Sequence, residues 1–73
     1  MRTFETATEA RAAAKAASVI IPKGITTWRS DHASTPFFEV WAAGQIVWSG
    51  FASSASEAKA NFISNMIAEK EAA

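Results

Sequence analysis

The stretch from residue 36 to residue 60 constrains the fold most, because two runs of strand-forming residues in it are separated by a short turn. Residues 37–41 and 45–51 are rich in aromatic and β-branched side chains, which favour strands. Ala42-Ala43-Gly44 lies between them and fits a three-residue hairpin loop whose glycine takes the left-handed conformation. The sequence therefore predicts an antiparallel hairpin in the middle of the chain.

The length of this loop decides which side chains share a face of the sheet, because side chains alternate along a strand. A three-residue loop pairs Val40 with Ile46 and makes one face wholly apolar. That face carries Phe38, Val40, Ile46 and Trp48, and the other carries Phe37, Glu39, Trp41, Gln45, Val47, Ser49 and Phe51. A two-residue loop would instead put Glu39 opposite Trp48, on the apolar side. We therefore expect the three-residue loop.

Two helices are expected to flank the strands, and each has a capping box at its start. Thr6 and Glu9 begin the first helix, which should extend to about residue 17 or 18. Ser54 and Glu57 begin the second, which should extend to about residue 69. The stripe of the first helix that faces the core consists of alanine. The second helix has the heavier apolar stripe, with Ala55, Ala58, Phe62, Ile63, Met66 and Ile67.

Between the first helix and the hairpin, residues 25–30 predict one more strand after Gly24. The three apolar residues at 19–21 stand just before Pro22, which excludes a helical residue 21, and we expect them to close the edge of the core. The resulting order is helix, three strands, helix. We therefore expect one small α+β domain over residues 1–73, with a three-stranded antiparallel sheet and both helices on one face.

Composition excludes several functions. The 73 residues contain no cysteine and carry a formal net charge of zero, which removes disulfides, thiolate metal sites and the usual attraction to nucleic acid. The start of the chain has no apolar signal region, and no apolar run approaches the ~20 residues of a membrane span, so we expect a cytoplasmic protein. Glu39 is the one carboxylate of the hairpin and has no acidic partner. We expect no enzyme, no cofactor and no metal.

The same pattern resembles the double-stranded RNA-binding domain family, a helix–strand–strand–strand–helix domain of about this length. The matching residues are His32, Phe37 or Phe38, Gly44, Gly50, and Ser54 with Glu57-Ala58-Lys59. The resemblance implies that fold and, as an alternative function, binding of double-stranded nucleic acid through Arg11, Lys15, His32 and Lys59. Where the family has two phosphate-gripping lysines, this chain has Ala55 and Ser56. The chain is also similar to the arm-binding domains of phage-type integrases, in the strand pair that runs into Gly50-Phe51.

The leading hypothesis concerns the sheet face that the helices leave open. Phe37, Trp41, Val47 and Phe51 share that face with a single charge, and such apolar patches on small proteins mark interfaces. We expect a non-catalytic module that binds a protein partner or a second copy. A chain of this kind is comparable to small phage or prophage accessory proteins that inhibit or adapt a host protein. A third reading is a folded subunit whose partner supplies the activity. Binding to phosphates would weaken steeply with salt, whereas burial of aromatic side chains would not.

Overall fold

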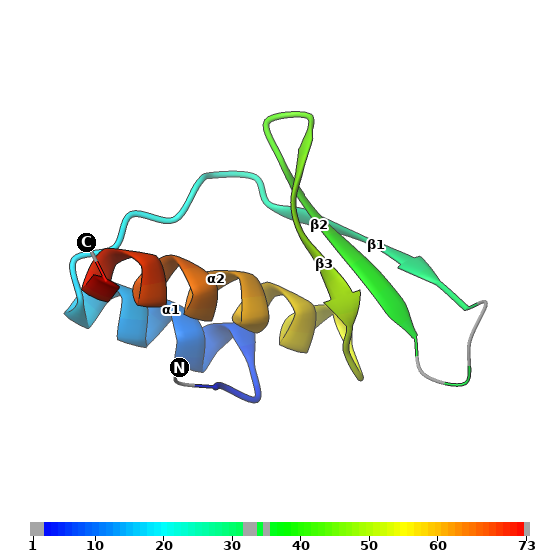
Figure 1. Cartoon of the computed structure of the whole chain (residues 1–73), viewed down its shortest axis with the longest axis horizontal. Helices are drawn as coiled ribbons and strands as arrows, with labels where there is room; N and C mark the ends of the chain where they lie inside the picture. Colours follow the sequence, from blue (N-terminus) through cyan, green and yellow to red (C-terminus); the bar gives the residue numbers. More distant parts are fainter. Residues whose placement is uncertain (1–2, 32–33, 35, 73) are drawn as a thin grey trace.

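The computed structural model describes residues 3–31, 34 and 36–72 and contains two helices and three strands (Figure 1). In chain order these are α1 (Ala7–Ala16), β1 (Thr26–Ser30), β2 (Phe37–Ala42), β3 (Gln45–Phe51) and α2 (Ala55–Ala72). The strands form one antiparallel sheet in the order β1-β2-β3, so β2 is central. The predicted α+β class and element order are confirmed.

Both helices begin at the predicted caps. The Thr6 hydroxyl accepts a hydrogen bond of 3.2 Å from the backbone N–H of Glu9, and the Ser54 hydroxyl accepts one of 3.1 Å from the N–H of Glu57. These bonds satisfy backbone donors that a helix start leaves without partners. α1 ends slightly earlier than expected, and Ser18, with a φ of 58°, turns the chain away from it. α2 continues three residues past the expected end, to Ala72.

α1 and α2 run side by side in the same direction, and side chains of α2 hold both ends of α1 (Figure 1). At the start, the backbone N–H of Ala7 donates to the Ser56 hydroxyl at 2.9 Å. At the far end, Lys70 Nζ donates to the carbonyl oxygen of Ser18 at 2.7 Å. α2 contacts all three strands, whereas α1 makes its contacts with α2. α2 is therefore the element through which α1 is joined to the sheet.

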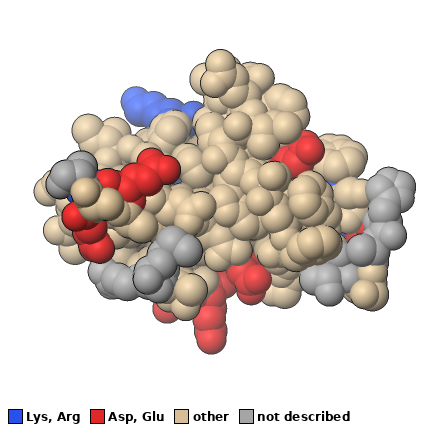
Figure 2. All heavy atoms as spheres, in the orientation of Figure 1, with Lys and Arg blue, Asp and Glu red and all other residues tan. Residues whose placement is uncertain are grey.

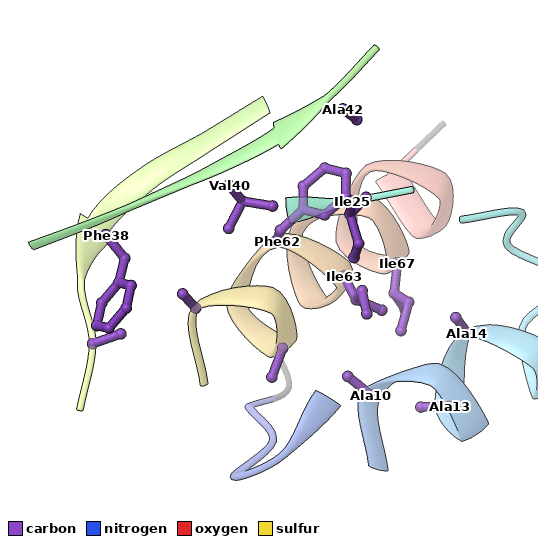
Figure 3. Close-up of a cluster of buried hydrophobic side chains, with 13 residues drawn as sticks. Ala10, Ala13, Ala14, Ile25, Phe38, Val40, Ala42, Phe62, Ile63 and Ile67 are labelled. Atoms are coloured by element: carbon purple, nitrogen blue, oxygen red, sulfur yellow. The ribbon is translucent and has the colours of Figure 1, made fainter. Parts of the chain in front are cut away.

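The core lies on both sides of α2, as Figure 3 shows. Toward the sheet, Phe62 lies near Val40 of β2 and Ile25. Toward α1, Ile63 and Ile67 face the small alanine side chains of that helix. Val40 and Ile63 are the largest fully buried side chains. The predicted alanine stripe of α1 is buried at Ala10, Ala13 and Ala14, and alanine allows the two helices to approach closely.

The segment between α1 and β1 closes the core edge only in part. Val19 and Ile21 are half-buried and pack against the core, as expected. Ile20 between them is 89% exposed, so that part of the expectation is wrong. The reason is local, because neighbouring side chains of an extended segment point in opposite directions.

The predicted three-residue hairpin loop is also wrong. Ala42 pairs with Gln45, which leaves a two-residue turn at Ala43 and Gly44. Their φ values are 52° and 75°, and positive φ at both central residues characterises the type I′ turn that suits a twisted hairpin.

A β-bulge next to this turn changes which residues of β3 face the helices. Trp41 pairs with Ile46, but Val40 pairs with Trp48, so Val47 is an extra residue of β3. The shift returns Trp48 to the helix side of the sheet, where it is half-buried against the core. Ile46, which we expected in the core, lies on the other side and is 49% exposed.

Candidate functional site

The side of the sheet turned away from α2, here called the outer face, carries an apolar surface. The alternating burial of β2 defines it, since Phe38, Val40 and Ala42 are buried and the residues between them are not. Strand register assigns the residues of the neighbouring strands to the same face. Its large members are Trp28 of β1, Phe37, Glu39 and Trp41 of β2, and Ile46 and Phe51 of β3, with Val47 of the bulge beside Ile46.

Three rows of paired residues cross the outer face. At one end Phe37 and Phe51 are paired, and their rings meet edge to face with centroids 5.5 Å apart. At the hairpin end, Trp41 is paired with Ile46. Glu39 belongs to the middle row, between Trp28 of β1 and Ser49 of β3. Aromatic side chains therefore lie on both sides of the one carboxylate.

Much of this apolar surface is open to water. Phe51 is 60% exposed, Trp28 53% and Val47 38%, and Ile46 is similarly open. Because a Trp or Phe side chain covers about 150–250 Å², these four side chains leave on the order of 400 Å² of apolar surface in water. Patches of roughly 300–600 Å² are the largest on ordinary monomers and are often functional. The outer face is thus large enough to be a binding surface.

Glu39 is the one charged side chain of the outer face, and it is half-buried. Its Oε1 atom accepts a hydrogen bond of 3.1 Å from Trp41 Nε1. Arg29 follows Trp28 in β1 and pairs with Phe38, so its side chain belongs to the opposite side of the sheet. There it forms an ion pair of 2.7 Å with Asp31, and its guanidinium lies 5.9 Å from the centre of the Phe38 ring. In the described part of the chain, no cation pairs with Glu39.

The structure brings together the residues that we expected to bind a partner. Phe37, Trp41 and Phe51 all lie on the outer face, and Val47 lies at its bulge. Two further members, Trp28 and Ile46, were missed. Trp28 could have been found by alternation once β1 was aligned with β2. Ile46 depends on the two-residue turn, which pairs it with Trp41, and Ala43 in that turn gives no sequence signal for a positive φ.

The residues expected to bind nucleic acid are spread over separate elements. Arg11 and Lys15 are exposed and one turn apart on α1, and Lys59 is half-buried on α2. His32 lies outside the described residues. On the face drawn in Figure 2, basic side chains show mainly at the upper left, and acidic ones show along the lower edge, at the left end and at the upper right. This face has no basic strip.

An open groove of about 540 Å³ lies where the two helices begin. It is lined by Thr3, Phe4, Glu5, Glu9, Glu57 and Asn61. Two of its three carboxylates serve the helix starts, since Glu9 accepts from the Thr6 hydroxyl and Glu57 accepts from the backbone and hydroxyl of Ser53. Among the described residues, no group of three or more acidic or histidine side chains is arranged to hold a metal ion. The groove is acidic and would repel phosphate.

Comparison with protein-family models, with curated proteins and with solved structures gives no significant match. Within the described residues, neither helix has the length and apolar character that crossing a bilayer would require. The outer face is therefore the feature from which we infer a function.

Proposed function

We propose that this chain is a small, non-catalytic protein-interaction module that binds a protein partner through its outer face. The observation that carries the proposal is the exposure of Trp28 and Phe51, each more than half open to water on the outer face of the sheet. Such surface gains free energy when it is covered, at about 25 cal/mol per Å² of apolar area removed from water. A patch of this size is a sufficient reason for association.

The composition of the outer face also fits a protein interface better than other kinds of site. Interface centres are enriched in tryptophan and phenylalanine and poor in charge, and aromatic anchors carry much of the binding energy. Here those anchors stand on strands, so little conformational entropy is lost when they are covered. We include in the proposal the accessory role expected from the sequence, in which the bound module inhibits or adapts a larger host protein.

The experiment compares exposed apolar residues on and off the outer face. Trp28→Ser and Phe51→Ser remove anchors, while Ile20→Ser removes an apolar side chain that is 89% exposed on the segment between α1 and β1. All three variants are expected to keep the circular dichroism spectrum of the wild type, because none removes a buried side chain. Affinity capture from host extract, with sedimentation velocity of the purified chain, then measures association.

The first two variants are expected to lose the partner, each weakening binding by ~2 kcal/mol or more, which is typical of an interface anchor. The Ile20 variant is expected to bind as the wild type does. Equal capture by all three variants would show that the outer face is not the binding surface. Concentration-dependent dimerisation that is lost in the same two variants would identify a second copy as the partner.

The second candidate function is binding of double-stranded nucleic acid by a domain similar to the double-stranded RNA-binding fold. It is supported by the α-β-β-β-α topology with its antiparallel sheet. The acidic groove at the helix starts counts against it, because Glu57 stands near the positions where the family has phosphate-binding lysines.

This candidate is tested by titrating the wild type and an Arg11→Gln, Lys15→Gln double variant with duplex RNA and duplex DNA. Roughly six to ten phosphate contacts would weaken about 10³–10⁵-fold between about 50 and 200 mM salt. We expect no such complex. A tight, salt-sensitive complex that only the double variant loses would establish nucleic acid as the ligand and displace the protein-binding proposal.

A further inference from the structure

Aromatic side chains of all three rows surround the carboxylate in the middle of the outer face. Glu39 has Trp28 as its neighbour across the strand pair and Phe37 and Trp41 two residues away along β2. Paired side chains on one face have Cβ atoms about 4.5–5.5 Å apart, and residues i and i+2 lie about 6.5–7 Å apart along a strand. Ser49 occupies the remaining side. One negative charge thus lies among three aromatic side chains.

The hydrogen bond from Trp41 Nε1 holds one oxygen of this carboxylate in place and leaves acceptor positions free. An ionised carboxylate has about four lone-pair sites, and Trp41 uses one of them on Oε1. In the described part of the chain, no cation pairs with Glu39, since Arg29 lies on the other side of the sheet with Asp31. A partner that covers the outer face therefore takes Glu39 out of water, which is costly unless the partner supplies a cation.

We infer, on the basis of the proposed function, that the partner inserts an arginine side chain at Glu39, between Trp28 and Trp41. A guanidinium donates hydrogen bonds to a carboxylate with matching planar geometry. Its flat faces also stack on indole rings, and tryptophan is the best aromatic partner for a cation. A lysine ammonium is a compact, strongly hydrated charge and would use the indole walls less well. Charge and aromatic geometry therefore favour arginine.

A second copy of the chain fits the same position poorly. Two copies related by a twofold axis bury the same patch on each side. An axis through the middle row would bring two Glu39 carboxylates against each other, and like charges placed together in an interface are strongly unfavourable. The partner that the outer face favours is a different protein with a basic side chain on an apolar surface.

The test uses the full chain labelled with ¹⁵N and follows its indole N–H signals by NMR. The probe is N-acetyl-arginine amide, whose only charge is the guanidinium. We expect saturable shifts of the Trp28 and Trp41 signals. The signal of Trp48, which is half-buried on the helix side, is expected to stay in place. Sodium chloride at the same concentration controls for ionic strength, and tetramethylammonium chloride supplies a cation that cannot donate hydrogen bonds.

Two charge-neutralising variants locate the site. Glu39→Gln keeps an oxygen that can accept from Trp41 but removes the charge. We expect it to weaken binding of the probe roughly tenfold, because the remaining hydrogen bond lacks charge assistance. Glu69→Gln makes the same change at an exposed position of α2 and is expected to bind as the wild type does. Unchanged binding by Glu39→Gln, equal shifts at Trp48, or equal shifts with sodium chloride or tetramethylammonium would overturn the inference.

The result can be separated from that of the proposed function. If the probe does not bind at Glu39 while Trp28→Ser still abolishes capture of the partner protein, the arginine site is wrong and the protein-binding surface stands. If neither variant on the outer face changes capture, the proposed function fails and the arginine inference fails with it.

Discussion

At the scale of single residues, the contact between Gly50 and Trp48 shows why a glycine stands near the end of the edge strand β3. A Cβ atom built on Gly50 would lie 2.9 Å from Cζ2 and Cη2 of Trp48, closer than non-bonded carbon atoms approach. The indole therefore lies along β3 and covers the glycine. This position requires glycine for space, whereas Gly44 has open space around it and a positive φ of 75°.

We predict that Gly50→Ala lowers the free energy of unfolding by about 1–3 kcal/mol, the range for overpacking a fitted site. Without the indole, an alanine in a strand would be neutral or stabilising, because it restricts the unfolded chain. The same change in a Trp48→Leu background should therefore cost less, with a coupling energy on the order of 1 kcal/mol. Urea unfolding of the four proteins in this cycle gives the coupling. A stabilising Gly50→Ala would contradict the contact.

At the scale of elements, the hairpin turn places an alanine where glycine or asparagine is usual. Ala43 has a φ of 52°, and a left-handed conformation costs a residue with a Cβ roughly 1–2 kcal/mol. Packing elsewhere offsets this cost, because the two-residue turn and the bulge at Val47 together bring Val40 opposite Trp48 on the helix side.

Ala43→Asn is predicted to raise the free energy of unfolding by about 1 kcal/mol, since Asn-Gly is a preferred type I′ pair. Ala43→Val is the matched control, because a β-branched side chain resists the left-handed region and should destabilise the hairpin. Thermal or urea unfolding measures both. If asparagine lowered stability as valine does, the turn would not have two residues.

The hairpin also shows where prediction from the sequence ends. The capping boxes and the alanine stripe of α1 could be predicted from the sequence, because Thr6, Ser54 and their partners act within one helical turn. The outer face could be predicted in part, because alternation along β2 places Phe37 and Trp41 on the same face. The two-residue turn could not be predicted, since alanine at position 43 carries no signal for a positive φ. The bulge could not be predicted either, because it places Trp48 against the core, and most residues of that core lie far from Trp48 in the sequence.

At the scale of the whole molecule, the contacts suggest that stability is uneven. α1 buries three alanine side chains against α2, whereas β2 and α2 bury the larger side chains of the core. A buried methyl group contributes only about 0.8 kcal/mol. Detaching α1 from α2 therefore costs much less free energy than separating α2 from the sheet.

Hydrogen exchange in the native state, measured in low concentrations of denaturant, should resolve this difference. We predict that the hydrogen-bonded amides of α1 exchange with a free energy on the order of 2 kcal/mol below that of the β2 amides, through an opening that leaves the sheet intact. Melting of both elements in one step, with equal exchange free energies, would show that α1 is part of a single cooperative unit.

Because α2 lies between α1 and the sheet, α1 and the outer face are two separate surfaces of the molecule. The exposed basic side chains Arg11 and Lys15 belong to α1, which makes its contacts with α2. The outer face is on the side of the sheet turned away from the helices (Figure 1). If a protein binds Trp28 and Phe51 as proposed, α1 with Arg11 and Lys15 stays in solvent and remains accessible to a second molecule.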